Sequence, residues 1–489
     1  MSRLVVVSNR VALPGAQQSG GLATALHAAL SQRGGVWFGW SGEARAKRSG
    51  ALHETADGAV SYVTMDLSRK DHNEYYNSFS NRTLWPLLHF RPDLVDYSRE
   101  TFEGYRRVNA LFADALAKLV KAGDLVWVHD YHLFPLGALL RERGVKARIG
   151  FFLHTPLPSA DLLSALPDHA RVFSRLTAYD LLGFQTARDL DHYRDYVRMV
   201  AGGHLLDEQR LRAPDGREFR AGAFPISIDT DLIATQAVTA VRQPPVRRLQ
   251  ESLAGRVLAI GVDRLDYSKG LPERFAAYGR LFHNQKDARG RISFLQIAPP
   301  SRSEVPEYRH LRERLEQQAG HINGMFADPE WVPIRYVNRS YAHSTLTGFY
   351  RLAQVGVVTP FRDGMNLVAK EFVAAQNEAD PGVLVLSCFA GAADEMDAAL
   401  IVNPFDIDGV AEALHAASTM PREERRERWQ TLMTRLREHN IGKWCSEFLR
   451  ELQQTGKPPP AGERRSGERR QAERRGNRRD DNGGRAAAR

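Results

Sequence analysis

Two cations in the second half of the chain have the types and spacing to hold a diphosphate. Arg264 and Lys269 lie in Gly261–Glu273, which follows an apolar run and precedes a helical pattern. Arginine offers a fork of donors and lysine a compact charge, so together they could balance a diphosphate without a metal ion. The alternative is a pair of surface salt bridges to Asp263 and Asp266. Two cations and a glycine in a loop between a strand and a helix favour the phosphate site.

Two carboxylates at the start of a later helical pattern could hold hydroxyl groups. Asp363 comes directly before the helix, Gly364 permits a tight turn, and Glu371 lies about a turn and a half inside. This spacing would place hydroxyls on either side of a phosphate bound at the helix N-terminus, which is the layout of a nucleoside diphosphate sugar. The alternative is that Asp363 caps the helix and that Glu371 is an exposed helical residue.

A third candidate anion site lies near the N-terminus. An apolar run ends near Arg10, and Ser19-Gly20-Gly21-Leu22 then opens a helical pattern. Glycines let a ligand approach the backbone, and the free N–H groups of a first helical turn attract an anion. The pattern is not GxGxxG, so it does not predict a dinucleotide fold. Taken alone, two glycines before a helix are more often a simple turn.

The elements that must position these loops are short apolar strands alternating with amphipathic helices. The predicted strands are Leu4–Ser8, Leu125–His129, Ile149–His154, Leu181–Gln185, Val257–Val262, Ile292–Ala298, Ile334–Val337, Gly356–Pro360, Val383–Ser387 and Leu400–Asn403. Helices are predicted over Leu22–Gln32, Asn366–Ala375 and Val410–Ala417. Continuous apolar strands separated by helices are typical of parallel sheets covered on both faces. There are too many strands for one sheet, so we predict an α/β protein with two doubly wound domains facing across a cleft, the ligand lying at the carboxyl ends of the strands.

The chain divides into three predicted parts. The segment Asp229–Gly255 contains the best boundary, which gives a first domain over residues 1–230 and a second over residues 231–455 that includes the final helix. Residues 456–489 form an Arg-rich tail that repeats Glu-Arg-Arg every five residues without one large apolar side chain. Such a segment cannot bury enough surface to offset the entropy of ordering, so we predict disorder there.

The net charge of +9 belongs mostly to this tail, which carries +6 from Lys457 onward. Its arginines could contact RNA or an acidic membrane, but the interleaved glutamates dilute the field, so we favour a solubilising extension over nucleic-acid binding. No run approaches the ~20 apolar residues of a membrane span, and Leu4–Val7 is too short for a signal peptide. Cys388 and Cys445 form no metal or redox motif, so we expect a cytoplasmic protein. With 43% hydrophobic and 26% charged residues, the composition excludes a fibrous or wholly disordered chain.

Several longer motifs make the chain resemble glycosyltransferase family 20, the family of trehalose-6-phosphate synthases. They are Val7-Ser8-Asn9-Arg10, Trp37-Phe38-Gly39-Trp40, Glu74-Tyr75-Tyr76-Asn77, Leu84-Trp85-Pro86, His129-Asp130-Tyr131-His132, Arg264-Leu265-Asp266-Tyr267-Ser268-Lys269-Gly270 and Arg362-Asp363-Gly364-Met365-Asn366-Leu367-Val368-Ala369-Lys370-Glu371. The resemblance runs in unbroken order from about Met1 to Leu452. It implies two Rossmann-like domains of the GT-B type, and the Asp363-to-Glu371 spacing is similar to the acid-x7-acid motif of retaining glycosyltransferases.

The activity implied by the resemblance is the transfer of glucose from UDP-glucose to glucose 6-phosphate, giving α,α-trehalose 6-phosphate and UDP. No metal and no cofactor are implied. No residue is an obvious nucleophile, so we expect front-face attack by the acceptor hydroxyl, with the departing phosphate accepting its proton and the configuration retained. Expected partners are the two substrates, a separate trehalose-phosphate phosphatase, and further copies of this chain in a dimer or tetramer.

The resemblance also assigns roles to single residues. Arg264 and Lys269 would grip the donor diphosphate, Asp363 would hold glucose hydroxyls, and Glu371 would hold the ribose. The other implied donor positions are Gly20, Gly21, Tyr341, Leu367, Val368, Ala369 and Lys370, of which the last four act through their backbone. The implied acceptor positions are Arg10, Tyr76, Trp85, Asp130 and Arg302. His154 would lie beside the transferred glucose, and the implied catalytic set is Arg264, Lys269, Asp130, His154 and Asp363.

Several of these positions have plainer interpretations when taken alone. A histidine such as His154 at a strand end is more often a core residue, Trp85 before a proline more often packs, and Arg302 could be an exposed loop charge. Thr155 stands where the family frequently has an aliphatic residue, and Tyr341 where it often has phenylalanine. The alternative functions are a glucosyltransferase with another phosphorylated acceptor, such as glycerol 3-phosphate, or with ADP- or GDP-glucose as donor, a catalytically silent sugar-phosphate-binding regulator, and an RNA-binding protein acting through its tail.

Overall fold

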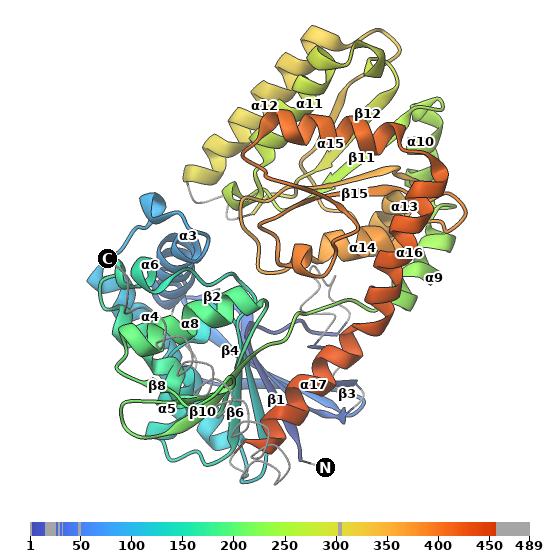
Figure 1. The fold of residues 1–489 in the computed structure, drawn as a ribbon. Coiled ribbons are helices and arrows are strands. Elements are labelled where there is room, and N and C mark those ends of the chain that lie inside the picture. Colours follow the sequence, from blue (N-terminus) through green and yellow to red (C-terminus); the bar gives the residue numbers. More distant parts are fainter. Residues whose placement is uncertain are drawn as a thin grey trace, which may run out of the picture. The chain divides into compact units, whose positions relative to one another are not determined.

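The computed structural model describes residues 2–14, 26–27, 30–31, 33–46, 50–301 and 306–455. This part of the chain holds two β-sheets, each built mainly of parallel strands with helices packed against it (Figure 1). The predicted α/β class with two doubly wound sheets is confirmed. Residues that contact one another fall into two units, Met1–Gln453 and Gln454–Arg489. The predicted tail, residues 456–489, lies outside the described residues.

The first sheet contains ten strands within the described ranges, in the order β3-β4-β2-β1-β5-β6-β7-β10-β9-β8. They are β1 (Leu4–Arg10), β2 (Gly35–Arg45), β3 (Leu52–Asp57), β4 (Val60–Ser68), β5 (Leu125–His129), β6 (Arg148–Phe152), β7 (Leu181–Phe184), β8 (His204–Leu205), β9 (Arg210–Arg212) and β10 (Glu218–Ala223). The inner strands pair in parallel, whereas β3, β9 and β8 add antiparallel edges. The chain order reverses at β1, so the loops after β1 and β5 open at a topological switch point, where ligands bind in such sheets.

Side chains of the first sheet alternate between two cores. Val5 and Val7 of β1 face the core that is covered by the π-helical segment η1 (His72–Leu84) and by helices α4 (Arg99–Leu119), α5 (Leu136–Glu142) and α8 (Ala187–Met199). Leu4 and Val6 face the opposite core. There the final helix, α17 (Ile441–Gln454), stacks Phe448 on Trp127 of β5, with ring centroids 4.7 Å apart.

The second sheet contains six parallel strands among the described residues, in the order β13-β12-β11-β14-β15-β16. They are β11 (Val257–Val262), β12 (Ile292–Ile297), β13 (Ile334–Val337), β14 (Val355–Val358), β15 (Val383–Ser387) and β16 (Leu400–Val402). Numbered along the chain this is the Rossmann order 3-2-1-4-5-6. Its switch point lies between β11 and β14, so the loops that follow these two strands are the expected ligand-binding loops.

Two helical layers cover the second sheet (Figure 1). One layer consists of α11 (Leu271–Asn284), α12 (Pro306–Phe326) and α15 (Ile407–Thr419). The other consists of α9 (Thr230–Ala240), α10 (Pro244–Leu253), α13 (His343–Leu352), α14 (Leu367–Ala375) and α16 (Arg422–Glu438). The short helices α2 (Arg69–Asp71), α3 (Trp85–Leu88), α6 (Ala160–Ser164) and α7 (His169–Phe173) belong to the first half of the chain. Within the described ranges, no helix combines the length and the apolar character that crossing a bilayer requires.

The chain crosses between the two sheets twice, and the crossings touch. The first crossing leads from β10 to α9, and the second leads from α16 back to α17. Ile441 N donates to the carbonyl oxygen of Ile228 at 3.0 Å, and Thr230 Oγ1 donates to that of Leu436 at 3.0 Å. The two crossing segments therefore support each other through backbone carbonyls.

Four predicted strands have the observed bounds: Leu125–His129, Val257–Val262, Ile334–Val337 and Val383–Ser387. The other predicted strands differ from the observed ones by one or two residues at one or both ends. Val410–Ala417 lies inside α15, and most of the helix predicted at Leu22–Gln32 lies outside the described residues. The domain division at residue 230 stays a prediction. The final helix, assigned with the second domain in that prediction, packs on the first sheet.

Candidate active site

The loop after β11 carries both predicted cations. Gly270 adopts φ +62°, and a Cβ there would lie 2.7 Å from the carbonyl oxygen of Thr359, so the turn into α11 requires glycine. Lys269 directly precedes it and is buried. Arg264 is exposed, and its guanidinium lies over the ring of Trp85, 5.4 Å from the ring centroid. The loop therefore holds one cation inside the protein and one at its surface.

Lys269 forms an ion pair with Asp363, which lies in the loop after β14. The same carboxylate accepts a hydrogen bond from Asn366 Nδ2 at 3.0 Å. Burial opposes ionisation of Asp363, but the charge and hydrogen bond of Lys269 outweigh it, so the pKa of Asp363 lies below its ordinary value. The two switch-point loops of the second sheet thus meet in a charged pair.

The salt bridges considered as an alternative, from the two cations to Asp263 and Asp266, are not formed. Asp263 pairs instead with the fully buried Arg274 at 2.6 Å. Arg274 also donates to the backbone carbonyl of Lys269 at 3.4 Å, so it supports the loop from behind. Asp266 accepts a hydrogen bond from Tyr308 at 3.0 Å.

Helix α14 begins at a cap that the sequence did not predict. Asn366, with φ +73°, is the N-cap residue, and its side chain accepts from Ala369 N at 3.3 Å. Asp363 is therefore not the capping residue. Glu371 is buried rather than exposed, and its carboxylate lies 3.4 Å from Nε2 of His343. The hydrogen bond to Glu371 raises the pKa of His343 despite partial burial of the ring.

The side chain of Lys370 turns away from this loop. Its Nζ donates to the backbone carbonyl of Ile226 at 2.8 Å and pairs with Glu395 at 2.6 Å. Burial lowers the pKa of Lys370, although Glu395 opposes the shift. Leu367 and Val368, in the first turn of α14, are partly exposed. The Lys370 ammonium therefore does not face this turn, and the backbone of the turn is the part that suits an anion at the helix N-terminus.

Asp130, directly after β5, has a strained backbone. Its φ of 75° and ψ of 164° fall in a region used almost only by glycine. Burial raises the pKa of its carboxyl group to about 6, while backbone N–H groups and the charge of Arg264 limit the rise. The His154 N–H donates to this carboxylate at 3.3 Å. Strain of this kind is concentrated at functional sites.

The loops of the two sheets meet beside Asp130. Gly364 packs so closely on the loop after β6 that a Cβ would lie 2.0 Å from the carbonyl oxygen of His154. Trp85 Nε1 donates to Asp266 at 3.5 Å, and the same indole lies under Arg264. Trp85 and the loops that carry Asp130 and His154, all from the first half of the chain, thereby meet the loops that carry Arg264 and Asp363.

Arg10 and Tyr76 flank a common tryptophan. The Arg10 guanidinium lies 5.9 Å from the ring centroid of Trp40, and the rings of Trp40 and Tyr76 have centroids 5.8 Å apart. Tyr76 also stacks on His132, at 5.7 Å between centroids. Arg10 is exposed, so a cation lies at the surface next to an aromatic cluster. The arrangement suits a phosphate and a sugar ring.

The remaining predicted site residues are placed as follows. Tyr341 packs edge-on against Phe349, with centroids 5.2 Å apart, and its hydroxyl accepts from Arg339 Nη2 at 2.8 Å. Thr155 is buried. Gly20, Gly21 and Arg302 lie outside the described residues.

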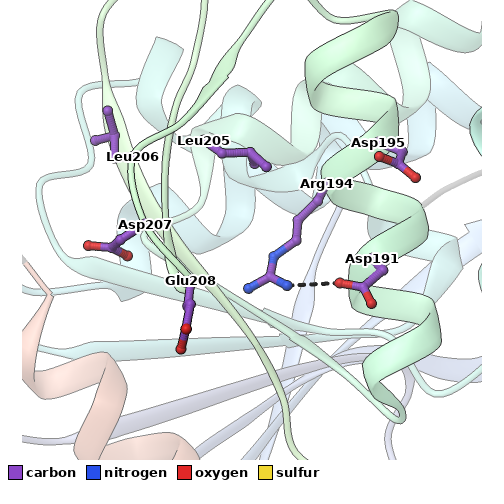
Figure 2. Close-up of a pocket in the computed structure, with 7 residues that line it drawn as sticks. All are labelled: Asp191, Arg194, Asp195, Leu205, Leu206, Asp207 and Glu208. Carbon is purple, nitrogen blue, oxygen red and sulfur yellow. Dashed lines mark hydrogen bonds and ion pairs between the residues drawn. The ribbon is translucent and has the colours of Figure 1, made fainter. Parts of the chain in front are cut away.

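A depression of about 670 Å³ has none of the predicted site residues in its lining (Figure 2). It is formed by α8 and the segment that begins at β8, and its lining consists of Asp191, Arg194, Asp195, Leu205, Leu206, Asp207 and Glu208. The guanidinium of Arg194 points to Asp191, at 2.8 Å. Four carboxylates against one guanidinium would repel phosphorylated ligands. Because of this negative charge, we do not take the depression as the candidate site. In the described ranges, no group of three or more His, Cys, Asp or Glu side chains is arranged to hold a metal ion.

Sequence reasoning missed the residues that support the predicted ones. Arg274, Asn366, Tyr308 and His343 each contact a predicted site residue or its loop. Asn366 stands at the start of an apolar helical pattern, which is a signal for an N-cap. No sequence spacing marks Arg274, Tyr308 or His343 as site residues, because the tertiary fold alone brings them to the site.

Comparison with known proteins gives a family for this geometry. The family model described as glycosyltransferase family 20 matches residues 6–454. A trehalose-6-phosphate synthase of Sinorhizobium fredii is 50% identical over 457 residues, which are 92% of this chain and 98% of that protein. A UDP-forming α,α-trehalose-phosphate synthase from Burkholderia xenovorans, solved in complex with glucose-6-phosphate, is 49% identical with a TM-score of 0.89, and the match covers 92% of this chain and 100% of that one.

A solved E. coli structure bound with UDP-2-fluoro glucose is 45% identical with a TM-score of 0.89 and covers 93% of this chain and 99% of that one. These identities extend along almost the whole of each chain, so the likeness is not confined to one sheet or motif. The expected GT-B fold agrees with these neighbours. On this evidence, the chain belongs to glycosyltransferase family 20.

Proposed function

We propose that this protein is a retaining glucosyltransferase that moves glucose from UDP-glucose to glucose 6-phosphate and releases α,α-trehalose 6-phosphate and UDP. The observation that carries the proposal is the ion pair of Lys269 with Asp363 at the switch point of the second sheet, where the loop of Lys269 also carries Arg264. Solved relatives at 49% and 45% identity hold glucose-6-phosphate and UDP-2-fluoro glucose, respectively, which supports both substrates.

On the donor side, Arg264 and Lys269 would hold the diphosphate of UDP-glucose. Asp363, kept ionised by Lys269, would accept hydrogen bonds from glucose hydroxyls. Glu371 would accept from the ribose, and the backbone of Leu367 to Lys370 would face the diphosphate and uridine. Gly20 and Gly21 would admit a donor phosphate, and Tyr341 would lie near the nucleobase. Each charge-assisted hydrogen bond contributes about 1.5–3 kcal/mol.

On the acceptor side, Arg10, Tyr76 and Arg302 would bind the phosphate of glucose 6-phosphate. Trp85 would pack on the acceptor, and Asp130 would accept a hydrogen bond from its sugar hydroxyls. The pKa of about 6 leaves Asp130 mostly ionised at neutral pH, as this role requires. The charge of Arg264 acts on Asp130, so an acceptor held by Asp130 would lie near the donor diphosphate and the bond that breaks.

The mechanism follows from the charges. Breaking the bond between glucose and phosphate puts negative charge on UDP, which Arg264, Lys269 and the N-terminus of α14 stabilise. The acceptor hydroxyl then attacks the same face from which UDP departs, and the departing phosphate oxygen takes its proton. The carbon–oxygen bond to phosphate breaks as the new carbon–oxygen bond forms, so the configuration is retained without a covalent glucosyl-enzyme.

The decisive experiment mixes purified protein with UDP-glucose and glucose 6-phosphate and identifies the product by NMR. We expect α,α-trehalose 6-phosphate and equimolar UDP, with the same rate in EDTA because the protein cations balance the diphosphate. Panels with ADP-glucose, GDP-glucose and glycerol 3-phosphate test donor and acceptor choice. Absence of turnover with every pair would contradict the proposal and favour a silent regulator. A requirement for divalent metal would contradict the mechanism.

Three further assignments belong to the same proposal. The product keeps its phosphate, so we assign its hydrolysis to a separate trehalose-phosphate phosphatase. We assign the protein to the cytoplasm because Cys388 and Cys445 are both free thiols. We also propose a homo-oligomer, a dimer or tetramer, which light scattering of the purified protein would test.

A further inference from the structure

Two histidines at the carboxyl ends of neighbouring strands are in direct contact. His129 ends β5, and His154 follows β6, which pairs with β5 in parallel. Nδ1 of His129 lies 3.1 Å from Nε2 of His154, and the ring centroids are 5.3 Å apart. His129 is fully buried, whereas His154 is partly exposed. The outer ring is therefore held by an inner one.

Both rings are neutral at physiological pH. Burial lowers the pKa of His154 to about 3, and burial together with the neighbouring His154 lowers the pKa of His129 well below its ordinary value. A neutral imidazole carries one proton on either of its two nitrogens. For the 3.1 Å contact to be a hydrogen bond, one of the two facing nitrogens must carry a proton and the other must not.

The surroundings of His129 decide which nitrogen carries the proton. Nε2 of His129 is buried and has no hydrogen-bond partner among the described residues. If His154 donated, the proton of His129 would sit on this Nε2 as an unpaired buried N–H, which native structures rarely contain. The ring nearest to His129 is that of Trp127, at 4.6 Å between centroids. The indole N–H of Trp127 is itself a buried donor without a partner among the described residues. A bare nitrogen on His129 suits this environment better than a second N–H.

We infer that His129 donates its Nδ1–H to Nε2 of His154 and so fixes His154 in the tautomer that carries its proton on Nδ1. His154 then presents an uncharged N–H donor to a hydroxyl of the glucose that is being transferred. His129 is a positioning residue, since it acts only through His154. The inference rests on the proposed function for the identity of the sugar, but the tautomer itself does not depend on that function.

An uncharged donor has a physical advantage at this position. The sugar becomes positively charged as UDP departs, and a protonated histidine beside it would repel that charge. A neutral N–H binds a hydroxyl without this penalty. The backbone N–H of His154 donates to Asp130 and its carbonyl packs on Gly364, so the backbone that carries the ring is held between the β5 and β14 loops. A fixed tautomer completes this orientation.

The tautomer can be observed directly in the full-length protein labelled with ¹⁵N-histidine. Long-range ¹H–¹⁵N spectra at neutral pH separate protonated from bare ring nitrogens, and the His154→Gln variant identifies the His154 signals. We expect a protonated Nδ1 and a bare Nε2 in both rings. A His154 that carries its proton on Nε2, or that is charged at neutral pH, would overturn the inference. This measurement requires no turnover, so it stands apart from a failure of the proposed function.

Variants of His129 separate positioning from folding. In His129→Asn, the side-chain amide can still donate to His154, whereas His129→Leu removes the donor. We expect His129→Leu to shift His154 toward the Nε2-protonated tautomer and to lower kcat/KM for UDP-glucose roughly tenfold or more, while His129→Asn restores most of both. An unchanged His154 tautomer in His129→Leu would refute the role. Equal losses in the two variants, with unchanged thermal stability, would refute it as well. If His129→Leu does not fold, the wild-type spectrum and His129→Asn still decide.

Discussion

Lys269 and Asp363 lie 94 residues apart in the sequence, and their ion pair joins the two switch-point loops of the second sheet. The same ammonium is expected to contact the donor diphosphate, so it serves two anions. In the free protein it balances a largely buried carboxylate. In the donor complex it would be shared with UDP-glucose, which makes donor binding sensitive to the charge of Asp363.

The stability of this pair can be tested with single and double variants. Among the described residues, Lys269→Met leaves the Asp363 carboxylate with Asn366 as its one side-chain hydrogen-bond partner. Asp363→Asn leaves the ammonium without this counter-charge. Each should lower the free energy of unfolding by up to about 3–5 kcal/mol. The double variant should lose less than the sum, because neither charge remains. Urea unfolding measures all four proteins, and additive losses would contradict a coupled pair.

The pH dependence of the pair follows from the lowered pKa of Asp363. The Asp363 carboxyl group binds protons more readily in the unfolded than in the folded protein. The contribution of the ion pair to the free energy of unfolding is therefore complete above the ordinary pKa of about 3.9. It is lost as the pH falls through the lower, folded pKa. Wild-type protein should therefore lose more stability in acid than Asp363→Asn, which has no such group.

The acid limb of activity should report Asp130. Its pKa of about 6 means that kcat/KM for glucose 6-phosphate should rise as the pH increases through about 6. The substrate phosphate also titrates near pH 6, so Asp130→Asn is the required control: it keeps the substrate titration and loses that of the enzyme. Arg264→Gln removes a charge that lowers the pKa of Asp130 and should move the limb to higher pH. Identical limbs in wild type and Asp130→Asn would exclude this assignment.

The strained backbone of Asp130 should make glycine stabilising at this position. Asp130→Gly relieves φ 75° and ψ 164°, which costs other residues about 1–3 kcal/mol. Asp130→Ala removes the same carboxylate but keeps the strain, so it is the matched control. We expect both variants to lose most activity. Calorimetry should show that Asp130→Gly melts at a higher temperature than Asp130→Ala. Equal melting temperatures would mean that the strain is absent in solution.

Glu371 and His343 offer a test of the ribose end of the site. His343 donates a hydrogen bond to the carboxylate of Glu371, which raises the pKa of His343. The stabilising contribution of this pair is therefore complete below about pH 6.5 and is lost as the pH rises through the folded pKa of His343. Glu371→Gln should lower the pKa of His343, which an NMR titration measures. It should also raise KM for UDP-glucose roughly tenfold, because a charged acceptor is lost. His343→Gln keeps the carboxylate and should change KM much less.

The sequence predicted β1, β5, β6 and β7 of the first sheet and all six strands of the second, because their apolar runs have few polar interruptions, as in Val257–Val262. It did not predict β2, β4, β8, β9 and β10. It missed β3 (Leu52–Asp57), whose residues are all exposed and carry no apolar pattern. It also missed the π-helical segment η1, since its apolar residues follow no strand or α-helix period. The motifs that carried the family resemblance named the candidate site residues, although their roles stay predictions.

The contacts inside the site could not be predicted from spacing. Lys269 meets Asp363 only because β11 and β14 are neighbours in the sheet, which the order of elements along the chain does not reveal. His129 meets His154 for the same reason, through β5 and β6. The cap at Asn366 depends on a left-handed backbone, and the inward turn of Lys370 depends on the position of Ile226.

The double crossing of the chain constrains how the protein could be recombined with its relatives. Ile441 and Ile228 are hydrogen-bonded partners in the two crossing segments, and α17 then packs on the first sheet. A chimaera made with a single junction would give the first sheet a terminal helix from the other parent. Exchanging the second sheet cleanly needs two junctions, one on each crossing, so that each half keeps its own native surface.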